Sequence, residues 1–290
     1  MTELKAQEAQ VKAEPDRRPV RRNGLTHGRG LVGVVLIGVI VLLGVLAPLL
    51  APFSPQEQIE GANLLGPSGT HPFGTDEVNR DVFSRVLYGI RIDLFICLIA
   101  VPAGALLGGL IGLVASQTGI ADVFAQRAFD VVLAFPPIIL GIGIAAITGT
   151  GVLPVVCVVI GAELPLFGRL VRTATLKVRE LPYVDAAESM GASRAWVLRK
   201  HIVPNILDSV IVQLALSASG AVFILSAMNF LGIGVKPPEP SLGGVLADAM
   251  AQLGSNTMYA VGPLLVIVVL VLGFQLIAQG LLAARRGGAS

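Results

Sequence analysis

Side chains that could catalyse a reaction are few in this 290-residue sequence, and none falls at the spacing of a common catalytic or metal-binding motif. Cys97 and Cys157 lie in apolar runs, with neither a CxxC nor a Cys/His spacing that would indicate a disulfide framework or a zinc site. The three histidines, His27, His71 and His201, are scattered, and no HExxH occurs. We therefore expect no metal and no catalytic residues in this chain.

The sequence also lacks the means to drive transport by itself. A P-loop needs a Gly-Lys pair to hold phosphates, and none of the five lysines follows a glycine. Ion-coupled carriers usually keep charged side chains at mid-membrane depth, but only Glu163 lies inside an apolar run away from its ends. Asp93 and Asp130 fall near run ends, where we expect water and lipid headgroups to solvate them. The sequence predicts a passive pathway whose energy comes from another protein.

The composition excludes a water-soluble globule. Hydrophobic residues make up 54% of the chain, charged residues 14%, and the mean hydropathy is +0.79. Soluble domains are about one-quarter charged, and a disordered chain would be more polar. The 21 basic and 19 acidic residues nearly balance, so we expect no nucleic-acid partner. A protein embedded in a lipid bilayer is therefore predicted.

Six apolar runs are long enough, at about 20 residues, to cross a bilayer as helices. The fourth is the shortest and carries Glu163 and Pro165. Pro48 and Pro52 stand where a signal peptide would have its cleavage box, so the first run is predicted to be an uncleaved anchor. The sequence thus predicts an all-α integral membrane protein with six transmembrane helices, at about residues 31–50, 92–115, 129–147, 152–167, 206–234 and 258–284.

Lysine and arginine set the orientation, because they collect on the cytoplasmic side of a membrane. If the N-terminal tail, residues 1–30, lies inside, then every basic residue lies inside except Arg80, Arg85, Arg91 and Lys236. We expect a multi-pass protein of the bacterial cell membrane with both termini in the cytoplasm.

The largest polar stretch between two spans covers about residues 169–205, and it predicts two short helices with a bend between them. Pro182 suits the first position of a helix, and Asp185 and Glu188 would lie in its first turns, where carboxylates complement the helix dipole. Gly191 can end this helix in the left-handed conformation. Ser193 can cap the next helix.

Pro204 is expected to limit the second helix, and small residues keep the corner narrow enough for another protein's cleft. The alternative is an interfacial helix pair whose basic residues, Arg194, Arg199 and Lys200, contact anionic lipid.

The corner resembles the EAA motif of bacterial ABC-importer permeases. Asp185-Ala186-Ala187, Gly191 and Ile202-Val203-Pro204 fill the places of that motif in register. Asp185 replaces the commoner Glu, and Val203 the commoner Leu. Further segments are similar to C-type permeases of peptide and nickel importers, although Asn79 stands where those usually have Gly. These segments are 47–55, 71–85, 127–136 and 229–243.

The resemblance implies a type I ABC-importer permease fold over residues 31–290. It implies a heterodimer with a homologous B-type permease, two ATPase subunits that bind the ATP and Mg, and an extracytoplasmic substrate-binding protein. The expected cargo is a di- or oligopeptide; nickel or another small solute, and a stand-alone secondary carrier, are the alternatives. Coupling to the ATPase is assigned by the resemblance to Asp185, Ala186, Ala187, Glu188, Gly191, Ala192, Arg194 and Pro204.

Several residues within or beside the spans have alternative interpretations. Gly104, Gly108 and Gly112 recur every four residues, which indicates close helix packing rather than a pore face. Glu163 either lines the cavity near a charged substrate, pairs with Arg169, or is exposed at the interface.

Two further interpretations concern charged residues. Asp130 is expected to form an ion pair with Arg127 or Arg169. Residues 80–87 are expected to form an interfacial elbow helix, with contact to the binding protein as the alternative.

Overall fold

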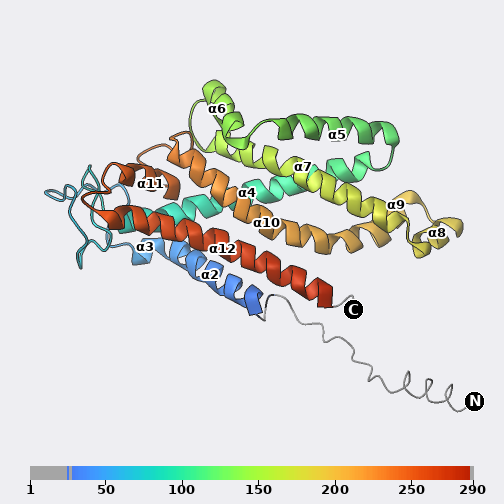
Figure 1. The fold of residues 1–290 in the computed structure, drawn as a ribbon, viewed down its shortest axis with the longest axis horizontal. Helices are drawn as coiled ribbons and strands as arrows, with labels where there is room; N and C mark the ends of the chain where they lie inside the picture. Colours follow the sequence, from blue (N-terminus) through green and yellow to red (C-terminus); the bar gives the residue numbers. More distant parts are fainter. Residues whose placement is uncertain (1–24, 26–27, 288–290) are drawn as a thin grey trace, which may run out of the picture.

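The computed structural model describes residue 25 and residues 28–287, and its long helices lie side by side along one axis (Figure 1). The predicted N-terminal tail therefore lies almost wholly outside the described residues. The helices are α2 (Gly28–Val45), α3 (Ala47–Leu50), α4 (Val82–Ala115), α5 (Gly119–Ala134), α6 (Pro137–Thr148), α7 (Val152–Arg179), α8 (Pro182–Ser189), α9 (Arg194–Val197), the π-helix η1 (Leu198–Ile202), α10 (Val203–Phe230), α11 (Leu242–Met250) and α12 (Thr257–Gly287).

The bundle has two different ends (Figure 1). One end, here called the α11 end, holds α3, α11 and the loop of residues 51–81. The other, here called the α8 end, holds α8 and α9. Among the described residues, α2, α4, α7, α12 and the continuous stretch Arg194–Phe230 are each long and apolar enough to cross a membrane. A bent pair, α5 with α6, brings the number to as many as six, which agrees with the predicted all-α membrane fold.

The helix that contains the second predicted span begins before that span, at Val82 instead of Ile92. The carboxylate of Asp81 accepts a hydrogen bond from the Ser84 amide at 2.7 Å and so caps the helix at this point. Val82 and Val86 are buried inside the protein. Residues 82–87 therefore do not form a separate elbow helix, because they are the first turns of α4 and their apolar side chains pack in the core.

The third span is broken, whereas the sequence predicted one run from Phe129 to Ile147. α5 ends at Ala134, α6 begins at Pro137, and their axes differ by 87°. A residue that precedes a proline is driven out of the helical conformation, and Phe135 and Pro136 both have extended ψ angles, of 125° and 134°.

The remaining spans differ from the prediction at their ends. α7 continues to Arg179 instead of ending at Phe167, so the polar stretch begins inside a helix. Pro204 does not limit a helix, as was expected, because it lies in the first turn of α10 directly after η1. A proline ring clashes with the carbonyl four residues before it in a regular α-helix, and the wider π turn before Pro204 accommodates that ring.

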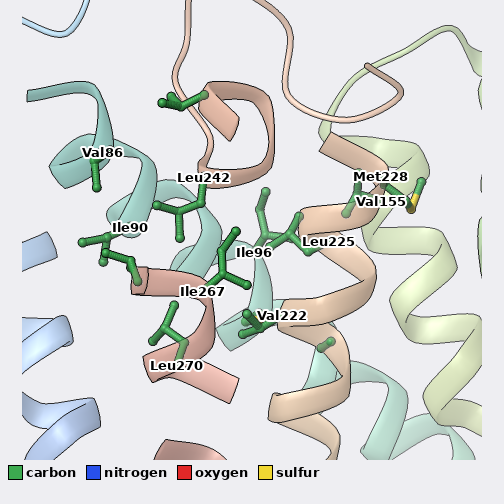
Figure 2. Packing of buried hydrophobic residues seen from close by; sticks show 14 of the residues in the cluster. Val86, Ile90, Ile96, Val155, Val222, Leu225, Met228, Leu242, Ile267 and Leu270 are labelled. Carbon is green, nitrogen blue, oxygen red and sulfur yellow. The ribbon is translucent and has the colours of Figure 1, made fainter. Parts of the chain in front are cut away.

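The core lies between α4, α7, α10, α11 and α12, whose apolar side chains meet toward the α11 end (Figure 2). Val86, Ile90 and Ile96 come from α4, Leu225 from α10 and Leu270 from α12.

α4 also runs against α7 along its three spaced glycines. A Cβ at Gly108 would lie 2.2 Å from the Leu164 carbonyl oxygen, and one at Gly112 would lie 2.1 Å from that of Gly168. The predicted close packing is confirmed.

Candidate functional site: a rigid corner at the α8 end

The corner between α8 and α9 is held by backbone hydrogen bonds. The Gly191 amide donates to the Glu188 carbonyl at 2.9 Å, and the Ala192 amide donates to the Ala187 carbonyl at 3.0 Å. With Gly191 at φ +87°, this is a Schellman motif. Ser193 then accepts a hydrogen bond from the Trp196 amide at 3.3 Å and caps α9. The predicted helix start at Pro182, the left-handed Gly191 and the Ser193 cap are all confirmed.

A small hydrophobic core fixes this corner to the long helices. Val184 and Ala187 of α8 and Val197 of α9 are buried against Val171 of α7 and Ile206 of α10. The corner is therefore attached to the ends of two spanning helices and moves with them.

The outer surface of the corner carries an open and mostly apolar hollow. A hollow of about 490 Å³ is lined by Ala187, Met190, Gly191, Ala192, Ser193 and Trp196. Met190 is 82% exposed and projects from the corner. Asp185, Ala186, Glu188 and Arg194 are also exposed. The structure thus gathers most of the predicted coupling residues at one place, whereas Pro204 is exposed on α10 and does not line the hollow.

An aromatic group beside the corner was not predicted. The rings of Tyr183 and Trp196 lie 5.4 and 5.1 Å from the ring of His201. The Asn205 side-chain amide donates to the Tyr183 hydroxyl at 3.2 Å and to the His201 carbonyl at 2.6 Å. Tyr183 and Asn205 are 22 positions apart and come from different helices, and the only signal in the sequence was that the single tryptophan falls in the polar stretch.

Glu163 lies in the middle of the bundle and is only 3% exposed. Its carboxylate accepts a hydrogen bond from the Ser217 hydroxyl of α10. Arg169 instead pairs with Asp130 at 2.5 Å, and Arg127 pairs with Asp130 at 3.5 Å. The expected ion pair of Asp130 is confirmed, and the Glu163–Arg169 pair and the interfacial exposure of Glu163 are wrong.

Asp93 is 2% exposed, so the expectation that water and headgroups solvate it is also wrong. The cause is the early start of α4 at Val82, which places Asp93 about three turns inside the helix. Its carboxylate is held by Asn229 of α10 and by the first amide of α11.

At the α11 end, charged residues hold the loop of residues 51–81. Asp76 accepts hydrogen bonds from the Arg80 amide at 2.8 Å and from Arg80 Nε at 2.7 Å. Arg85 lies 3.6 Å from both Asp76 and Asp248. Burial raises the pKa of the Asp248 carboxyl, and the positive charge of Arg85 opposes this rise. Asp81 and Arg85 are buried, so direct contact of either with a binding protein is excluded in this conformation.

Within the described residues, no cluster of three His, Cys, Asp or Glu side chains could hold a metal ion.

Comparison with known families identifies two matches within the chain. Residues 100–285 match the model of the binding-protein-dependent transport system inner membrane component. Residues 25–67 match the N-terminal transmembrane domain of oligopeptide transport permease C.

Two curated relatives cover most of the chain. A dipeptide transport system permease protein of Alkalihalophilus pseudofirmus is 36% identical over 87% of this chain and 83% of its own length. A glutathione transport system permease protein of Pectobacterium atrosepticum is 38% identical over 74% of this chain and 72% of its own length. Among solved structures, an inward-facing MetNI methionine ABC transporter matches with a TM-score of 0.57 and 19% identity, over 70% of this chain and 95% of that chain. That last match shows that the fold is shared.

Proposed function

We propose that the chain forms half of a peptide pathway in an ATP-driven importer, because it belongs to the family of binding-protein-dependent transport system inner membrane components. Membership of this family makes the chain a transporter subunit and not an enzyme. The observation that carries the coupling role is the corner at the α8 end, which is exposed, narrow and fixed to two spanning helices. A transporter subunit that hydrolyses no ATP needs such a stiff protrusion to receive movement from an ATPase.

The proposed partners fall at the two ends of the bundle. Two ATPase subunits, which bind the ATP and Mg, would dock at the α8 end, and a substrate-binding protein would dock at the α11 end. A homologous B-type permease would supply the other half of the pathway. The basic residues near the α8 end, such as Arg172, Lys177 and Arg179, support a cytoplasmic location for that end and for both termini.

The coupling works as a lever. An ATPase groove would receive Ala186, Gly191 and Ala192, whose small side chains let another backbone approach closely. Asp185 and Glu188, both exposed, would form polar contacts at the rim. Because α8 packs on the ends of α7 and α10, closure of the ATPases would shift these two helices as rigid bodies.

The proposed substrate is a di- or oligopeptide, which the names of both curated relatives support. Glu163 is proposed to line the pathway when the Ser217 hydroxyl of α10 moves away from it, since this neutral hydroxyl is the only hydrogen-bond partner of its carboxylate among the described residues.

The first experiment is purification of the tagged chain from its native membrane in mild detergent, with identification of the proteins that co-purify. A second permease with one or two P-loop ATPases is the expected result. A chain that purifies alone and transports when it is reconstituted alone would contradict the proposal and indicate a secondary carrier.

The second experiment tests the corner with the double variant Asp185→Lys/Gly191→Arg. We expect it to enter the membrane but to lose its ATPases and its uptake. The matched control is Glu60→Lys/Gly61→Arg at the α11 end, because Gly61 also has positive φ (+74°) and open space around it. The control should retain the ATPases. Normal uptake by the corner variant would exclude the corner as the coupling element.

A further inference from the structure

Asp93 joins three helices at the α11 end of the bundle. One carboxylate oxygen accepts a hydrogen bond from the Asn229 side-chain amide of α10 at 3.2 Å. The other accepts one from the Leu242 backbone amide, the first of α11, at 3.1 Å. No lysine, arginine or histidine among the described residues forms an ion pair with Asp93. The carboxylate is therefore held by two neutral donors that arrive from two different elements.

The helices around Asp93 leave no space for adjustment. A Cβ at Gly89, one turn before Asp93, would lie 3.1 Å from the Leu242 nitrogen. A Cβ at Gly243 would lie 2.1 Å from the Ser226 carbonyl oxygen of α10. Leu242 itself is fully buried in the core, near Ile90 and Ile96 of α4 (Figure 2). The start of α11 thus sits directly on α4 and α10.

Asn229 extends this arrangement to the turn between α10 and α11. While its amide nitrogen donates to Asp93, its Oδ1 accepts a hydrogen bond from the Val235 amide at 2.9 Å. One pair of side chains therefore fixes both the turn that leaves α10 and the helix that follows it.

A carboxylate is a costly choice for this position. Burying a charge without a cationic partner is unfavourable, and an apolar side chain would pack without that cost. Only a carboxylate offers two acceptor oxygens to two separate donors at once. The two hydrogen bonds therefore explain why a carboxylate occupies this buried position.

We propose that Asp93 is a positioning residue for transport, which fixes α11 as a cover over the α11 end of the pathway. The inference rests on the proposed function, in which that end receives the substrate. α11 lies against α4, α10 and α12 at the end opposite the corner (Figure 1). With Asp93 in place, α4, the end of α10 and α11 move as one body. Without it, ATP-driven movement of the corner continues while the cover no longer follows.

The test uses the complete importer in proteoliposomes, with uptake of a dipeptide and ATP hydrolysis measured on the same samples. In Asp93→Asn, the side chain has one acceptor oxygen for two donors. We expect uptake per ATP hydrolysed to fall about tenfold, the factor that corresponds to about 1.4 kcal/mol for one buried hydrogen bond. ATP hydrolysis per complex should stay within about twofold, because the corner is untouched. Proportional loss of both activities would indicate a merely structural role and overturn the proposal.

The exchange variant Asp93→Asn/Asn229→Asp provides the rescue. Asn at position 93 accepts from the Leu242 amide and donates to Asp at position 229, which still accepts from the Val235 amide, so every hydrogen bond is kept. We expect the exchange to restore the uptake per ATP. An exchange variant as defective as the single variant would overturn the proposal.

Hydrogen–deuterium exchange of the full chain gives a second readout that needs no partner. Asp93→Asn should raise hydrogen exchange in residues 242–250 about tenfold and leave hydrogen exchange in residues 182–189 unchanged. The double variant Asp93→Asn/Asn229→Asp should reverse the effect. Asp130→Asn, on α5, removes a carboxylate without touching α11 and should leave residues 242–250 unchanged. Unchanged exchange in Asp93→Asn would overturn the proposal. A native chain that binds no ATPase would instead overturn the proposed function alone.

Discussion

Glycines decide how closely α4 and α7 approach. Gly104, Gly108 and Gly112 lie on one face of α4, and backbone atoms of α7 occupy the space where the side chains of larger residues would be. In a membrane, where lipid is as apolar as the helices, such close packing is a main source of helix association. This contact between the three glycines of α4 and the backbone of α7, here called the seam, holds α7 in place. Through α7 it also holds the corner.

The seam predicts a position-specific effect of one methyl group. Gly108→Ala places a Cβ 2.2 Å from the Leu164 carbonyl oxygen, so α4 and α7 must separate, at a cost of about 1–3 kcal/mol. Gly109→Ala is the matched control, because its Cβ lies 3.5 Å from Val171 Cγ2, an ordinary contact. Thermal unfolding in detergent should show a lower melting temperature for Gly108→Ala alone. Equal melting temperatures would contradict the seam.

Among the helices, α5 is attached in a different way. Phe129 is the one buried residue of α5, and ion pairs fasten the helix to α7. Arg172 donates through Nε and a terminal nitrogen to both carboxylate oxygens of Asp122, and Arg169 pairs with Asp130. Since α5 buries little and is followed by the 87° break, we expect it to open locally at a lower cost than the helices of the core.

This attachment predicts that α5 is sensitive to charge and salt. Arg172→Leu should raise hydrogen–deuterium exchange in residues 119–134 about two- to fivefold, which corresponds to a loss of about 0.5–1 kcal/mol. High salt should reduce the difference in exchange between the native chain and Arg172→Leu, because salt screens the Arg172–Asp122 ion pair of the native chain. Arg127→Leu is the control: this side chain is 80% exposed and its pair is 3.5 Å long, so exchange should change little. Equal effects of the two variants would show that packing holds α5.

Short-range sequence patterns predicted the corner and the number of candidate spans. Contacts between residues far apart in the sequence explain why the predictions for Asp93 and Glu163 were wrong. Pro182, Gly191 and Ser193 act on their immediate neighbours, so their roles were visible in the sequence. Asp93 depends on Asn229, 136 positions away, and Glu163 depends on Ser217, 54 positions away. No periodicity encodes such pairs. The break at Pro136 was missed because hydropathy stays high across it, although the proline pair itself opposes a straight helix.

At the scale of the whole molecule, the two ends have different constructions. The α8 end is a stiff corner on a small core, and the α11 end is a loop and a short helix held by buried polar groups. The spans between them expose apolar side chains such as Leu98 and Phe124, each 72% exposed, to lipid or to another subunit.

The proposed orientation predicts a labelling pattern. In a chain without its two native cysteines, Glu60→Cys at the α11 end should react with a membrane-impermeant maleimide on intact cells. Glu180→Cys at the α8 end, outside the proposed ATPase contact, should react only after the membrane is permeabilised. Both side chains are exposed in the structure, so access from each side of the membrane decides the result. The reverse pattern would show that the corner lies outside the cell.

The π turn at Leu198–Ile202 determines the direction in which the corner points around the axis of α10. Each residue of an α-helix advances the chain by about 100° around the axis, and a π turn accommodates one extra residue without lengthening the helix by a turn. Everything before Leu198 is therefore rotated about α10 relative to the phase that a regular helix would impose. A lineage that lost one residue here would keep its spans and its seam, yet its corner would point about 100° away from its present direction and so away from the proposed ATPase.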